Sequence, residues 1–137
     1  MNFRNFESQN NGMKNTQDYI QGNKDKFLKE LVELLRIPSV SADPVYKNDV
    51  AHCADELAKH MREIGLDAVE ICPTAGHPIV YAEKIIDSAL PTILVYGHYD
   101  VQPPEPLELW TSPPFAPEIA AEPPCCVSSW QPPLASE

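Results

Sequence analysis

The chain has 137 residues, enough for one domain with a buried core, and its 43% hydrophobic content is typical of a globular protein. Its formal net charge of −10 argues against nucleic acid and anionic membranes as partners, because both require a basic patch. No apolar run reaches the roughly 20 residues of a membrane span. The polar start lacks a secretory signal's apolar core, and the four cysteines match no zinc-ribbon spacing, so we expect a cytoplasmic protein with free thiols.

The first third of the chain predicts a leader, a helix and a loop. Residues 1–15 are rich in Asn, Gln and Ser without apolar periodicity, which predicts a disordered leader. A helix is expected from about Asp18 to Arg36, and Pro38 ends it because the residue before a proline disfavours helical geometry. Its predicted apolar stripe comprises Phe27, Leu28, Leu31, Leu34 and Leu35. Residues 37–44, IPSVSADP, form a loop for which an ordinary connecting role is sufficient.

A second helix is predicted from Asn48, a good N-cap, to Ile64, with Gly65 as its C-terminal stop. Its predicted apolar stripe comprises Val50, Ala54, Leu57, Met61 and Ile64. His52 and His60 lie off this stripe and eight positions apart, too far to share a metal, so we interpret them as solvated surface histidines. Cys53 is expected to be a small half-buried residue without a reactive thiol.

Three short strands are then expected, at residues 66–72, 79–84 and 93–96. The third, Ile-Leu-Val-Tyr, is continuously apolar and bounded by Pro91 and Gly97, which is typical of a parallel strand buried on both faces. Two helices followed by strands predict the opening of an α/β domain. His77 falls in the turn between the first two strands, where exposure is the default unless carboxylates cluster nearby.

His98 and Asp100 follow the third predicted strand directly. Positions i and i+2 of an extended chain point to the same side, so both side chains should project together from the strand's carboxyl end, where open α/β sheets build their sites. A carboxylate beside an imidazole suits metal binding, because it can orient the ring while the other ring nitrogen ligates the metal. The motif is short, and a surface His–Asp pair in a loop is the alternative.

Most of the 15 prolines fall between Pro103 and Pro133. Residues 103–106 and 114–117 each fit P-x-x-P, a polyproline II pattern that SH3-like modules bind. Neither repeat carries the basic residue that would meet an acidic groove. A Pro-rich interaction fragment is therefore kept as an alternative.

From about Asp25 to Ile119 the sequence resembles the co-catalytic zinc peptidase family of dipeptidases, aminoacylases and acetylornithine or succinyl-diaminopimelate deacylases. The strings YGHYDVQP and PLELWTSPPF carry the resemblance, and the carnosinase-like dipeptidase branch is the most similar. The resemblance implies that residues 16–119 are the incomplete N-terminal part of an α/β/α catalytic domain. It also implies that Trp110 and Phe115 anchor the loop after the metal strand.

The resemblance further implies that His98 is a zinc ligand and that Asp100 is the catalytic-site carboxylate holding its tautomer. The complete family site holds two zinc ions, but the bridging Asp, the paired glutamates and the distal His have no matching positions here. Family members act on dipeptides or N-acyl amino acids, and the complete enzymes form homodimers. We therefore predict a fragment of a zinc-dependent dipeptidase-like metallohydrolase that is inactive as this chain, or alternatively a non-catalytic remnant.

Residues 120–137 depart from the family pattern and form an atypical Pro-rich tail. They lack the Gly-rich strand and the doubled aspartate that follow in the family, as another reading frame, an altered splice or a rearranged end would produce. With no regular apolar period, the tail is expected to be disordered.

Overall fold

The computed structural model describes residues 14–119. The predicted leader and tail lie outside the described residues, except that residues 14 and 15 are already helical. The named elements, in chain order, are α2 (Lys24–Leu35), the short 3-10 helix η1 (Pro44–Tyr46), α3 (Lys47–Glu63), β1 (Asp67–Cys72), β2 (Ile79–Glu83) and a second 3-10 helix, η2 (Leu107–Leu109).

The first predicted helix is interrupted at Asn23. Residues 14–22 are helical, Asn23 forms a turn, and α2 then continues to Leu35. The Tyr19 carbonyl accepts hydrogen bonds from both the Asn23 side chain, at 2.8 Å, and the Asn23 backbone amide, at 3.1 Å. The helix ends before Pro38, as predicted.

The apolar stripe of α2 remains largely uncovered. No residue of this helix is fully buried, and Phe27, Leu31 and Leu35 are 37%, 51% and 44% exposed. The helix is therefore amphipathic, as its spacing predicts, but its apolar face meets little of the rest of the described chain.

The second predicted helix, α3, begins one residue earlier than expected. Asp43 caps η1 by accepting a 2.9 Å hydrogen bond from the Val45 backbone amide, and α3 follows η1 directly. Asn48 thus lies inside the helix and is not its N-cap, because η1 already supplies the entry turn. At the other end Gly65 adopts φ +84°, the left-handed conformation that glycine adopts without strain, and the predicted stop is confirmed.

The buried face of α3 is rotated relative to the predicted stripe. Its fully buried residues are Val50, Cys53, Ala54 and Ala58. Leu57 and Met61 are only half-buried and Ile64 is 57% exposed. Three of these four buried residues are small, and α3 packs against both strands of the hairpin. Cys53 is consequently buried rather than half-buried.

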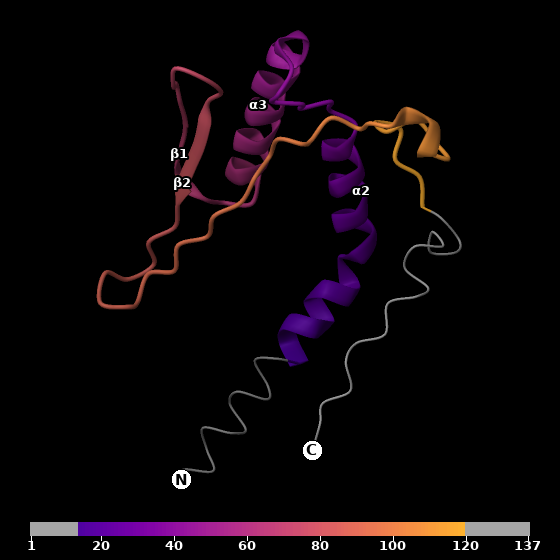
Figure 1. The fold of residues 1–137 in the computed structure, drawn as a ribbon. Coiled ribbons are helices and arrows are strands. Elements are labelled where there is room, and N and C mark those ends of the chain that lie inside the picture. Colours follow the sequence, from indigo (N-terminus) through magenta and orange to yellow (C-terminus); the bar gives the residue numbers. More distant parts are fainter. Residues whose placement is uncertain (1–13, 120–137) are drawn as a thin grey trace, which may run out of the picture.

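β1 and β2 form an antiparallel hairpin, with Ile71 opposite Val80 and Cys72 opposite Ile79. The hairpin packs on one side of α3, and α2 lies on the other side, so α3 separates the two (Figure 1). No helix among residues 14–119 is long and apolar enough to cross a membrane.

The third predicted strand does not form. Residues 91–100 have no regular secondary structure, and Ile93, Leu94, Val95 and Tyr96 are between 82% and 90% exposed. A parallel strand needs neighbours that supply its hydrogen bonds, and the only sheet among the described residues is the two-stranded hairpin. The expectation of a strand buried on both faces is therefore wrong for this chain, although the segment's composition is that of a strand.

The loop after residue 100 is also more exposed than expected. Trp110 is 50% exposed and Phe115 is half-buried. Trp110 therefore does not act as a buried anchor among the described residues.

Candidate functional site

The segment Tyr99–Val101 is held against the loop that follows α2. Ser39 Oγ donates a 2.8 Å hydrogen bond to the Tyr99 carbonyl, and the Val101 amide donates a 3.0 Å bond to the Ser39 carbonyl. Val40 and Val101 form an isolated parallel bridge. Ser39 and Val40 are only 2% and 1% exposed. The chain around Asp100 is thus fixed by backbone contacts about 60 residues away in sequence.

His98 and Asp100 lie together, as their spacing predicts. His98 Nδ1 is 3.4 Å from Asp100 Oδ1. The imidazole is 71% exposed, whereas the carboxylate is 34% exposed. The His98 ring also meets the Tyr96 ring edge-on, with centroids 5.4 Å apart. The imidazole is therefore largely accessible to a ligand from solvent.

The second oxygen of the Asp100 carboxylate has its own partner. Ser41 Oγ donates a hydrogen bond of 2.6 Å to Asp100 Oδ2. This hydrogen bond is the main reason why the pKa of Asp100 lies below its usual value, and the neighbouring His98 lowers that pKa further. Asp100 is consequently held ionised, the form that can accept a hydrogen bond from a protonated ring nitrogen of His98.

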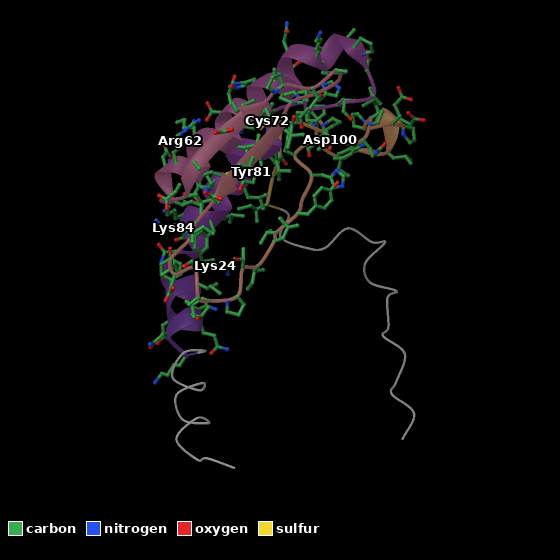
Figure 2. The ribbon with its side chains drawn as sticks, turned by 90° about the vertical axis from the view of Figure 1, so that its left-hand side faces the viewer. Lys24, Arg62, Cys72, Tyr81, Lys84 and Asp100 are labelled. Carbon is green, nitrogen blue, oxygen red and sulfur yellow. The ribbon has the colours of Figure 1, made fainter. Side chains whose placement is uncertain are left out.

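The hairpin turn meets the same region. His77 Nε2 lies 3.0 Å from the Ser41 carbonyl, and the Tyr99 hydroxyl donates to the Pro78 carbonyl. Figure 2 places Asp100 toward the Cys72 end of the hairpin, far from Lys84 at its other end. His77 is therefore half-buried rather than exposed, and Ser41 connects it to the Asp100 carboxylate.

Cys53 reaches the site from α3. Its Sγ lies 3.4 Å from the Tyr99 carbonyl, which also accepts from Ser39. Burial raises the pKa of the Cys53 thiol. The thiol is thus a protonated packing group under the candidate site, which agrees with the expectation of an unreactive cysteine.

Sequence reasoning missed Ser39, Ser41 and His77 as parts of this region. Their contacts join positions far apart in the chain and leave no periodic signal. The string IPSVS, with two hydroxyls two positions apart, is the one feature that could have indicated a shared contact surface, since alternate residues of an extended loop face the same way.

The described residues do not complete a metal site. Within residues 14–119, no three His, Cys, Asp or Glu side chains gather closely enough to hold a metal ion. A catalytic zinc needs about three protein ligands, and His98 with Asp100 behind it supplies one. His52 is exposed, and His60 lies 3.9 Å from Glu30 of α2. No catalytic step through a metal can be derived from these residues alone.

The described chain is thus a mixed helix–strand structure with a His98–Asp100 pair held against the loop after α2. Comparison with known proteins identifies the class further. The chain is 32% identical over 110 residues to the Cys-Gly metallodipeptidase of Candida albicans, covering 72% of this chain and 23% of that protein. It is 38% identical over 69 residues to the succinyl-diaminopimelate desuccinylase of Dechloromonas aromatica, covering 50% of this chain and 18% of that protein.

A solved structure extends the comparison to the fold. The structure of the di-peptidase Dug1p from Saccharomyces cerevisiae matches with a TM-score of 0.65 and 27% sequence identity, covering 71% of this chain and 22% of that one. No protein-family model matches the chain. The predicted resemblance to the dipeptidase and deacylase family is confirmed, as is the α/β class. The chain corresponds to the N-terminal part of these proteins and spans about a quarter or less of their length.

Proposed function

We propose that this chain is the N-terminal part of a zinc-dependent metallohydrolase that cleaves dipeptides or N-acyl amino acids in the cytoplasm. In this proposal His98 is a zinc ligand, Asp100 orients its imidazole, and residues 16–119 are the N-terminal part of the catalytic domain. The complete enzyme would act as a homodimer. The observation that carries the proposal is the 3.4 Å pairing of His98 Nδ1 with Asp100 in a chain related to metallodipeptidases.

The chain alone is proposed to be inactive. One imidazole holds zinc too weakly to compete with water and buffer, because a catalytic zinc takes about three protein ligands. Hydrolysis also needs a general base within reach of the attacking water. Among residues 14–119 the Asp100 carboxylate is committed to Ser41 and His98 and is not free for that role.

Zinc content and hydrolysis of Cys-Gly by the 137-residue chain test its inactivity. We expect weak zinc binding, no turnover, and little change in either on His98→Ala. His52→Ala, which changes an exposed histidine of α3, is the matched control. Zinc-dependent turnover that vanishes in the His98 variant, but not in the His52 variant, would show that this chain is an enzyme in its own right.

A chimaera tests the assigned roles. Residues 14–119 would replace the matching part of the Candida albicans metallodipeptidase, so that the absent ligands are supplied. There His98→Ala should abolish hydrolysis, and Asp100→Asn should lower metal affinity roughly 10–100-fold through loss of the group that orients the ligand. An active chimaera that tolerates His98→Ala would remove His98 from the ligand set.

The second candidate is a non-catalytic fragment that binds a partner. The exposed apolar run Ile93–Tyr96 favours it, because a run 82–90% exposed is available for pairing with another chain. A pull-down that depends on residues 103–117 would identify the P-x-x-P segments as the binding element. Loss of binding on changing residues 93–96 instead would identify the apolar run.

A further inference from the structure

The loop residues 39–41, here called the serine loop, contact the candidate site in two different ways. Ser39 holds the backbone, through the bonds of 2.8 Å to the Tyr99 carbonyl and 3.0 Å from the Val101 amide. Ser41 instead reaches a side chain, with its hydroxyl 2.6 Å from Asp100 Oδ2. The loop therefore controls both where residue 100 lies and how its carboxylate is turned.

The direction of the Ser41 bond is fixed by chemistry. An ionised carboxylate only accepts hydrogen bonds, so the Ser41 hydroxyl must donate to it. Bonds of this charge-assisted kind are short and strong, in agreement with the 2.6 Å separation. With Oδ2 held by Ser41, the other oxygen, Oδ1, is the one left facing His98 Nδ1 at 3.4 Å.

The backbone contacts prevent the carboxylate from moving away as a whole. Ser39 and Val40 are buried, and the Val40–Val101 bridge fixes the chain on one side of Asp100. On the other side, the Tyr99 hydroxyl is bonded to the Pro78 carbonyl of the hairpin turn. The main freedom left to Asp100 is rotation of its side chain, and the hydrogen bond from Ser41 restrains that rotation.

We propose that Ser41 is a positioning residue that, by turning the Asp100 carboxylate, holds the neutral His98 imidazole in the tautomer with its proton on Nδ1. In that tautomer Nε2 carries the lone pair, on a side chain that is 71% exposed. The use of that lone pair as a metal ligand rests on the proposed function, whereas the tautomer itself does not. The serine loop is thereby a part of the site and not merely a connection between α2 and α3.

The tautomer can be measured directly on the full chain without metal or substrate. Long-range proton–nitrogen NMR spectra of uniformly ¹⁵N-labelled protein distinguish the two nitrogens of each histidine ring, and the spectrum of His98→Gln assigns the His98 signals. The measurement is made at a pH of about 8.5, above the ordinary pKa of a histidine side chain in a model peptide. The measured quantity is the ratio of the Nδ1–H tautomer to the Nε2–H tautomer of His98. Ser41→Ala should shift this ratio toward the Nε2–H form by a factor of roughly five, the effect of losing about one net hydrogen bond.

Two further variants separate the hydroxyl's role from a general loss of structure. Ser41→Thr keeps the donor and should retain the original ratio. Thr74→Ala removes a hydroxyl from the hairpin turn, where it bonds to the His77 carbonyl, and should leave the His98 ratio unchanged. If Ser41→Ala fails to fold, as backbone amide spectra would show, Ser41→Cys keeps the side-chain size with a weaker donor and should give a smaller shift in the same direction.

The proposal is overturned if Ser41→Ala, or Ser41→Cys in its place, folds and keeps the original ratio, or if Ser41→Thr shifts it as far as alanine does. Because no metal is present, such a result would leave the hydrolase proposal standing. Conversely, a chimaera without His98-dependent hydrolysis would leave the tautomer result untouched. The two proposals therefore fail independently.

Discussion

Cys53 is the residue at which the core and the candidate site meet. It is 1% exposed, and its Sγ lies 3.4 Å from the Tyr99 carbonyl. Burial disfavours the thiolate and raises the pKa of this thiol. Since the thiolate is the reactive form, burial and the raised pKa should both slow its modification.

We therefore expect iodoacetamide to modify Cys72, which is half-buried, before Cys53 at a pH of about 7.5, as followed by mass spectrometry of the separate peptides. The raised pKa also makes the stability of the fold depend on pH. Because folding raises the Cys53 pKa, the stability provided by the protonated thiol is complete below the unfolded-chain pKa of about 8.5. It is lost as pH rises toward the folded-state pKa. Denaturant should abolish the difference between Cys72 and Cys53 in their rate of modification by iodoacetamide. Equal rates in the native chain would contradict the buried placement.

At the scale of elements, α3 provides the packing on which the hairpin and the serine loop rest. Val50 is fully buried on it, whereas Val45, in the preceding η1, is 79% exposed. Val50→Ala should lower the free energy of unfolding by about 2 kcal/mol through lost burial and the resulting cavity. Val45→Ala, the same chemical change at an exposed site, should stay within about 0.5 kcal/mol. Urea unfolding of both variants measures the difference, and equal effects would show that α3 does not form the core.

How far sequence predicts these elements depends on the range of the contacts involved. The helices and the hairpin follow from apolar spacing and from stops such as Pro38 and Gly65, which act locally. The run Ile93–Tyr96 has strand composition, but a strand exists only where a neighbour completes its hydrogen bonds, and composition does not report that neighbour. The contacts of Ser41 with Asp100 were likewise unpredictable, because they join residues 59 positions apart.

The same difference between local and long-range contacts applies to the candidate site. The pairing of His98 with Asp100 follows from their separation of two positions along an extended chain. The orientation of the two side chains does not follow from this spacing, because it depends on the Ser41 hydroxyl of the serine loop and on the turn of the hairpin. Local spacing therefore indicates which residues can act together, and tertiary contacts determine how they face.

For the molecule as a whole, apolar surface is unevenly distributed between a small core and exposed faces. Among residues 14–119, the fully buried hydrophobic residues come from α3 and Val40, while Ile93–Tyr96 forms a continuous run 82–90% exposed. An extended apolar segment with unpaired backbone groups pairs readily with a copy of itself. We therefore expect the chain to associate increasingly with concentration.

Two isoleucines with equal exposure separate the effect of that run from general hydrophobicity. Ile93 lies in the run and Ile86 lies in the loop after β2, and both are 85% exposed. Ile93→Lys should reduce association, because a charge on an exposed strand-like segment opposes pairing, whereas Ile86→Lys adds the same charge elsewhere and should change it little. Sedimentation velocity over a concentration series measures both. A monomeric chain at all concentrations, or equal effects of the two lysines, would show that the 93–96 run does not drive association.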